Sequence, residues 1–191
     1  MEHSMYIGLA RQRLNGMWLM SAVAYLLYSL IMNASLSAFI GIILIGPLEY
    51  GLVKYLQKQA DEGVSSIETM FSGFNRFAET MVASLLKVII ESIGLALFII
   101  PGIMASLGLS MTFYIMADEP NISGIDALKK SWQMMEGYKM DFLLFNLRFI
   151  GWGLLSILTC GLGFLFLVPY FKTAQLYYYR ELRNNRRSIY Y

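Results

Sequence analysis

The sequence predicts an all-α membrane protein, and three observations lead to this fold class. Of the 191 residues, 57% are hydrophobic and 15% are charged, and the mean hydropathy is +0.54. Such a chain has too few polar groups to surround a water-soluble core, so lipid must cover much of its surface. The apolar residues gather in paired runs of helical length, and a polar, amphipathic segment precedes each pair. We therefore expect about six transmembrane helices in three helical hairpins.

The first unit opens with an amphipathic segment near residues 4–14, which we expect to lie as a helix at the membrane surface. Trp18 follows it, where an indole keeps its N–H in water and its ring in the acyl region. Two spans are expected at about 17–32 and 38–55, joined by a tight turn at 33–37.

The second unit has the same order. A surface helix is expected at 64–79, because one stripe of it is apolar: Ile67, Met70, Phe71, Phe74 and Phe77. Spans follow at 81–99 and 103–116, with Pro101-Gly102 as the outer turn. These spans are short, since a helix needs roughly 20 residues to cross about 30 Å of hydrocarbon. Either the bilayer thins locally or the hairpins stop short of the far surface.

The third unit is the clearest of the three. A surface helix is expected at 122–137, and two apolar runs follow at 142–158 and 162–179. Only Thr159-Cys160-Gly161 separates the two runs, which predicts a helical hairpin. A basic tail occupies 183–191.

Short sequence matches indicate that these units are repeats. Ala60-Asp61-Glu62 recurs as Ala117-Asp118-Glu119, and the stretch 64–70 recurs as 122–128, a spacing of about 58 residues. A fainter match relates 12–18 to 133–139. The chain is thus predicted to be one domain, 1–191, built as a three-fold parallel repeat with units 1–59, 60–116 and 117–182. Chance similarity between amphipathic helices is the alternative.

The positive charges predict the orientation of the chain. The lysines and arginines outside the spans lie in or beside the surface helices and the tail, and the turns at 33–37, 100–102 and 159–161 carry none. By the positive-inside rule, both termini are then cytoplasmic and the chain crosses the membrane several times. Arg180, Arg183, Arg186 and Arg187 cluster just beyond the last span. They are candidates for contacts with anionic lipid, or they only set the topology.

We single out four ionisable residues inside predicted spans, where charge is expensive and usually finds a partner or a wet cavity: Glu49, Lys87, Glu91 and Arg148. Counting from the cytoplasmic boundary, Glu91 and Arg148 lie roughly 13–17 Å deep, near the midplane. We therefore expect these two to pair, directly or through Glu49. One interpretation is a polar cavity open to the cytoplasm for a small or lipid-like ligand, and the other is a structural ion pair.

No pattern of catalytic residues stands out. The sequence lacks a Gly-x-Ser-x-Gly elbow, a His-Glu-x-x-His motif, a phosphate loop and a dinucleotide fingerprint. His3 is the one histidine and Cys160 the one cysteine, which argues against a zinc site and an internal disulfide. A net charge of +2 is too small to indicate nucleic acid. We expect no enzymatic activity, cofactor or metal.

The sequence also resembles a known family. The residues that carry the resemblance include Ser131, Met134, Met135, Gly137–Lys139, Phe149–Trp152, Leu155, Ser156, Thr159, Gly161, Gly163, Pro169, Tyr170, Tyr179–Leu182, Ile100–Ile103, Tyr114, Ala117, Asp118, and the early Gly46, Pro47, Leu48 and Gly51. They are similar to the bacterial integral membrane proteins of domain-of-unknown-function family 975. The resemblance implies a multi-span bacterial protein and leaves its biochemical role open. A weaker likeness is to the membrane domain of some glycerophosphodiester phosphodiesterases, without their catalytic residues.

Two classes of function remain. The first is a non-enzymatic membrane binding or interaction protein that handles a lipid, peptide or protein partner at the cytoplasmic face. The absence of catalytic groups and of large outer loops favours it. The second is a small transporter or permease-like protein, which the charges inside the spans and the helix-breaking prolines favour. The oligomeric state is left open.

Overall fold

The computed structural model describes residues 3–14, 18–34, 38–159 and 161–189. Within these ranges the chain is almost entirely helical and contains no strand, which confirms the all-α class. The elements are α1 (His3–Leu14), α2 (Trp18–Ala34), α3 (Ala38–Glu62), the 3₁₀ helix η1 (Ile67–Arg76), α4 (Phe77–Leu97), α5 (Ile99–Gly108), α6 (Thr112–Asp118), α7 (Gly124–Met134), α8 (Lys139–Leu158) and α9 (Phe164–Ile189).

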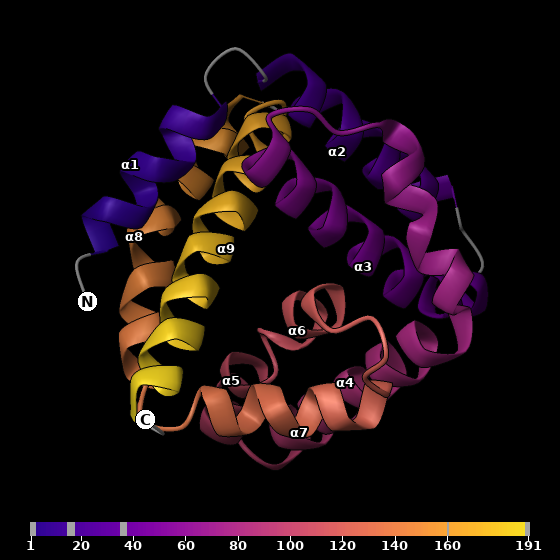
Figure 1. Ribbon diagram of the computed structural model, residues 1–191, viewed down its shortest axis with the longest axis vertical. Coiled ribbons are helices and arrows are strands. Elements are labelled where there is room, and N and C mark those ends of the chain that lie inside the picture. Colours follow the sequence, from indigo (N-terminus) through magenta and orange to yellow (C-terminus); the bar gives the residue numbers. More distant parts are fainter. Residues whose placement is uncertain (1–2, 15–17, 35–37, 160, 190–191) are drawn as a thin grey trace.

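The helices follow one another around a ring in the view of Figure 1. The ring closes where α1, at the start of the chain, packs along α9, at its end. The largest cluster of buried residues takes in most of α6 and the middle of α9, with Tyr114 and Tyr179 stacked at a centroid distance of 5.7 Å. The short helix α6 is thus the most buried element, while long helices surround it.

Each helix that was expected at the membrane surface packs against the last helix of a hairpin. η1 packs on α3, α7 packs on α6, and α1 packs on α9. The contact between η1 and α3 is backbone to backbone, because a Cβ added at Gly51 would lie 1.7 Å from the carbonyl oxygen of Met70. A Cβ at Gly73 would lie 1.9 Å from the carbonyl oxygen of Pro47. Glycine is therefore required at both positions.

The surface segment predicted at 64–79 is a 3₁₀ helix that runs directly into α4. The side chains of its apolar stripe lie partly in the protein interior and partly on the outer surface. Met70 is buried against α3, whereas four others are exposed: Ile67, Phe71, Phe74 and Phe77. The three phenylalanine rings stack in a row, with centroid distances of 6.3 and 6.4 Å. The exposed row is an apolar surface of the kind that lies in a membrane interface.

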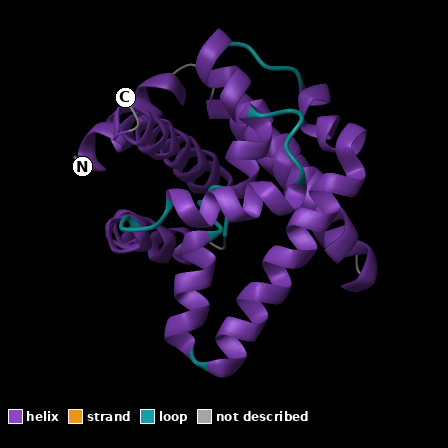
Figure 2. Cartoon of the chain, turned by 60° about the horizontal axis from the view of Figure 1, so that its bottom comes forward, coloured by secondary structure: helices purple, strands orange, loops and turns teal. Residues whose placement is uncertain are grey.

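The hairpin of α4 and α5 projects from the rest of the molecule, with its short turn at the tip (Figure 2). The turn is at Phe98, so the prediction that Pro101-Gly102 forms it was wrong by three residues. Pro101 instead occupies the first turn of α5, where its missing N–H costs no hydrogen bond. Gly102 then lets α5 approach α4, since a Cβ there would lie 2.5 Å from the side chain of Leu95.

The span predicted at 103–116 is also divided, into α5 and α6. The division coincides with a side chain from α7. The Ser131 hydroxyl donates to the Gly108 carbonyl at 2.8 Å and accepts from the Met111 N–H at 3.1 Å. It thus satisfies backbone groups that a broken helix leaves open.

The two helices α3 and α9 extend beyond the predicted spans 38–55 and 162–179. Because α9 is helical to Ile189, the predicted basic tail 183–191 is largely the last part of a packed helix rather than a separate segment. Most of the predicted turn 33–37, together with Cys160, lies outside the described residues.

Three stretches of the described chain are long and apolar enough to cross a membrane: Ile67–Leu97, Ile99–Asp118 and Lys139–Leu158. Trp18–Ser29 is a shorter apolar helix. Within these stretches many large apolar side chains are exposed, as they are in a protein whose outer surface faces lipid. The molecule is therefore a helical membrane protein.

Candidate functional site

Three charged side chains from three helices meet in the interior of the helical bundle. The Glu49 carboxylate of α3 lies 3.0 Å from the Lys172 ammonium of α9 and 3.9 Å from the Lys87 ammonium of α4. Each of these side chains is about one-fifth exposed, at 18–21%. One carboxylate between two ammonium groups leaves this cluster with one excess positive charge.

Neighbouring side chains hold this charge cluster in place. The Tyr114 hydroxyl of α6 lies 3.1 Å from the Lys172 carbonyl and 3.3 Å from the side-chain oxygen of Gln175. The Lys87 ammonium lies 5.6 Å from the centre of the Phe113 ring. Glycine brings α3 and α4 together next to Glu49, since a Cβ at Gly46 would lie 2.1 Å from the Thr80 carbonyl. The cluster therefore joins α3, α4, α6 and α9.

The structure brings together two of the four predicted intramembrane charges and not the other two. Glu49 and Lys87 form an ion pair, but the expected pairing of Glu91 with Arg148, directly or through Glu49, was wrong. Glu91 has a buried carboxylate oxygen with no hydrogen-bond partner, and Arg148 is exposed on α8. Glu91 lies on α4 and Arg148 on α8, and each of these helices packs against α5.

Sequence reasoning missed Lys172. It lies in the apolar run of α9, three residues after Pro169, and a charge at that place was a visible signal. Its partner Glu49 follows Pro47 by two residues in α3. Charges soon after a proline in two separate spans could have suggested a pair.

A second polar cluster surrounds Asp118 at the end of α6. Its carboxylate accepts from the Gln57 amide at 3.1 Å and from the Tyr179 hydroxyl at 2.7 Å, and it forms an ion pair with Arg183. The other aspartate of the repeated Ala-Asp-Glu motif, Asp61, lies 2.6 Å from Arg180. Both aspartates of the repeated motif thus bind arginines of α9.

These contacts change the interpretation of the basic cluster. Arg180 and Arg183 are 26% and 34% exposed and pair with carboxylates of the same chain, so their charges tie α9 to α3 and α6. Both arginines therefore have a structural role within the chain, and their contact with anionic lipid stays a prediction. The side chains of Arg186 and Arg187 lie outside the described residues, so their contact with lipid stays a prediction.

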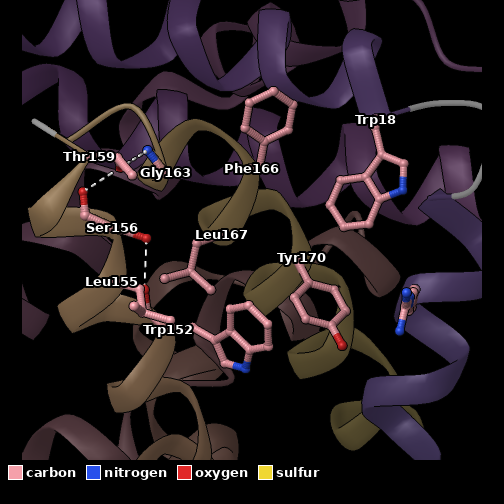
Figure 3. Close-up of a pocket in the computed structure, with 10 residues that line it drawn as sticks. Trp18, Trp152, Leu155, Ser156, Thr159, Gly163, Phe166, Leu167 and Tyr170 are labelled. Carbon is pink, nitrogen blue, oxygen red and sulfur yellow. Dashed lines mark hydrogen bonds between the residues drawn. The ribbon is translucent and has the colours of Figure 1, made fainter.

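A groove of about 400 Å³ opens between α1, α2, α8 and α9, and we call it the α8–α9 groove (Figure 3). Its lining is mostly apolar and aromatic: Arg11, Trp18, Trp152, Leu155, Ser156, Thr159, Gly163, Phe166, Leu167 and Tyr170. The Trp18 and Tyr170 rings have centroids 5.8 Å apart, and Figure 3 shows Tyr170 between Trp18 and Trp152. Residues from both ends of the chain therefore build one groove.

Polar groups in the walls of the α8–α9 groove bond mainly to one another. The Ser156 hydroxyl donates to the Trp152 carbonyl at 2.8 Å, and the Thr159 hydroxyl accepts from the Gly163 N–H at 3.0 Å, as Figure 3 shows. Arg11 is the one charged side chain of the lining, and no carboxylate pairs with it among the described residues. The groove thus offers an apolar channel with one cation.

A second groove, of about 430 Å³, lies between α4 and α7, and we call it the α4–α7 groove. It is lined by Leu86, Ile90, Leu109, Ile125, Leu128, Lys129, Trp132 and Gln133. Neither groove is lined by the Glu49 cluster, so the buried charges and the apolar grooves are separate features.

The fold and the grooves define a helical membrane protein with two mostly apolar surface grooves. Comparison with family models gives the family: residues 92–186 match that described as Protein of unknown function (DUF975). This half of the chain belongs to that family, and the family predicted from the sequence is confirmed. No curated protein and no solved structure matches the chain. The likeness to the phosphodiesterase membrane domain therefore stays a prediction.

Proposed function

We propose that the protein is a non-enzymatic membrane protein that binds a membrane lipid in the α8–α9 groove. The observation that carries this proposal is an open apolar groove whose one charged side chain, Arg11, pairs with no carboxylate among the described residues. An acyl chain matches the apolar walls, and a phosphate matches the guanidinium, which binds oxyanions through paired N–H donors. Tryptophan and tyrosine suit such a boundary, because each has an apolar ring and one polar group.

The proposal includes the membrane topology. Six spans form three hairpins, the surface helices and both termini face the cytoplasm of a bacterial inner membrane, and the three units are repeats. The packing of η1 on α3, α7 on α6 and α1 on α9 supports the repeat, because each surface helix packs against the last helix of a hairpin. In this topology the α8–α9 groove is lined at one end by Thr159 and Gly163, beside the outer turn, and at the other end by Arg11 of the first surface helix, which meets lipid phosphates.

Two neighbouring leucines of α8 allow a matched test. Leu155 lines the α8–α9 groove, whereas Leu154 does not, and they are 55% and 60% exposed. The substitution Leu155→Gln should reduce co-purifying phospholipid, measured by native mass spectrometry in detergent, by about tenfold, because losing a buried leucine side chain costs about 1.5–3 kcal/mol. Leu154→Gln should leave the bound lipid unchanged. Equal lipid content in both variants and the parent protein would refute the proposal.

A transporter is the second candidate, and the specific observation that favours it is the excess positive charge among Glu49, Lys87 and Lys172. A permeating anion would interact with the lysine that Glu49 does not neutralise. Anion flux into proteoliposomes that Lys172→Met abolishes, with the protein still folded, would favour this candidate. We place lipid binding first because both grooves are apolar and neither reaches these charges.

A further inference from the structure

We propose that the α4–α7 groove is a second phospholipid site, selective for an anionic headgroup. This inference rests on the proposed function, because it assigns the same class of ligand to a second place in the fold. The ligand is a phospholipid whose acyl chain lies along α4 and whose phosphate lies beside Lys129.

The first argument is the position of the groove. The α8–α9 groove lies where the last hairpin meets α1, the helix that packs on α9. The α4–α7 groove lies where the α4–α5 hairpin meets α7, the helix that packs on α6. In both places the helices of a hairpin form one side of an apolar groove, and a surface helix forms the other side. The two grooves have similar volumes, about 400 and 430 Å³.

The second argument is the distribution of tryptophan. The chain has three tryptophans, and all of them line these two grooves: Trp18 and Trp152 the first, and Trp132 the second. Trp132 is 41% exposed. Indole rings concentrate at the boundary between headgroups and acyl chains, so their placement marks both grooves as lying at that boundary.

The third argument is charge. The Lys129 ammonium lies 3.9 Å from the Asp126 carboxylate, and these side chains are 71% and 63% exposed. An ion pair so open to water contributes little, so it leaves Lys129 available to a phosphate. The Lys139 ammonium lies 3.4 Å from the centre of the Trp132 ring, which places a second cation next to the groove. Two cations beside an apolar channel suit an anionic phospholipid.

The tryptophans allow each groove to be tested separately, because a bromine on an acyl chain quenches only a nearby indole. A Trp18→Phe, Trp152→Phe variant reports only Trp132, and a Trp132→Phe variant reports only the α8–α9 groove. Each full-length variant, in detergent micelles, is titrated with phosphatidylglycerol carrying brominated acyl chains. Brominated phosphatidylcholine tests the headgroup, and a brominated free fatty acid tests whether the chain alone suffices.

We expect saturable quenching of Trp132 by the brominated phosphatidylglycerol. Lys129→Gln in the Trp132-only variant should weaken this binding about fivefold, since one lysine near a phosphate contributes about that factor. Lys58→Gln is the matched control, because Lys58 also belongs to an exposed ion pair, 3.8 Å from Glu62, but lines neither groove. It should not change the titration.

The outcomes separate the two proposals. If the Trp132→Phe variant is quenched and the Trp132-only variant is not, the second site is refuted and the proposed function stands. If only Trp132 is quenched, the proposed function fails and the second site stands. Equal quenching by phosphatidylcholine or by the fatty acid, with no effect of Lys129→Gln, would overturn the anionic phospholipid as the ligand. Ile125→Gln, in the groove wall, should weaken binding of every brominated lipid.

Discussion

Glu49 faces two lysines, and this decides how substitutions in the charge cluster should act. Glu49→Gln leaves both ammonium groups without a counter-charge, so we expect it to lower the free energy of unfolding by about 3 kcal/mol. Replacing all three residues with methionine should recover most of that loss, because no charge then remains. Thermal unfolding in detergent measures both effects, and a melting temperature equal to the parent's in Glu49→Gln would contradict the structural role.

Glu91 and Arg148 should behave differently, because the structure shows no pair between them. Arg148→Met and Glu91→Gln are each expected to change the melting temperature little or to raise it, and their effects should add, as for residues without a shared partner. A pair would instead give strong coupling of about 3 kcal/mol in the double-mutant cycle. If such coupling were measured, the predicted ion pair between Glu91 and Arg148 would be supported after all.

For single residues, the sequence was enough to identify several charged side chains inside the spans, but not to predict which of them form ion pairs. Depth along a span follows from counting residues, whereas the direction of a side chain around the ring depends on which helices are neighbours. Lys87 and Glu91 lie one turn apart on α4, and only Lys87 reaches a partner. The same limit applied to Arg180 and Arg183, whose carboxylate partners come from helices far away in the sequence.

The helices meet closely at glycines, and this gives a test at the level of elements. Gly51→Ala places a Cβ 1.7 Å from the Met70 carbonyl, so η1 must move away from α3, whereas a Cβ at Gly8 of α1 has nothing within 4 Å. We expect Gly51→Ala to destabilise the fold by several kcal/mol, roughly the upper range for point substitutions. Gly8→Ala should be neutral or stabilising by up to about 1 kcal/mol, since alanine is the better helix former. Similar melting temperatures for the two variants would argue against the η1–α3 contact.

Element types were predictable, and some boundaries were not. At the start of α7, which was predicted as a helix, the Ser123 hydroxyl caps the helix by accepting from the Asp126 N–H at 3.1 Å. The division between α5 and α6 was not predictable, since it coincides with a hydrogen-bonding side chain from α7, Ser131. The 3₁₀ form of η1 was also missed, because apolar residues three and four apart suit an α-helix equally well.

The proposed topology can be tested with cysteines placed in a Cys160→Ser background. Phe98→Cys, at the tip of the projecting hairpin, should react with a membrane-impermeant maleimide from outside the inner membrane, as in spheroplasts. Asn184→Cys, near the end of α9, should react only after the membrane is opened. Reaction of both cysteines from the same side would contradict the three-hairpin arrangement.

For the whole molecule, composition alone was enough to predict a helical membrane protein, and the motifs of the last third pointed to its family. The contact between α1 and α9, which closes the ring, could not be predicted from the sequence. The two helices are separated by almost the whole length of the chain, and no local sequence pattern indicates that they pack together. The α8–α9 groove depends on this contact. The hydroxyl of Tyr170 donates to the Ile7 carbonyl at 3.2 Å, and Arg11 and Trp18 reach the groove from the other end of the chain.

The most direct test of lipid binding in that groove is photo-crosslinking with a phosphatidylglycerol that carries a diazirine in its acyl chain. Peptide mass spectrometry then maps the residues that react. Lipid in the groove predicts crosslinks concentrated on Trp152, Leu155 and Phe166 at lipid amounts near one per protein. Crosslinks spread evenly over exposed apolar residues outside the groove, such as Ile93 and Leu97, would contradict it.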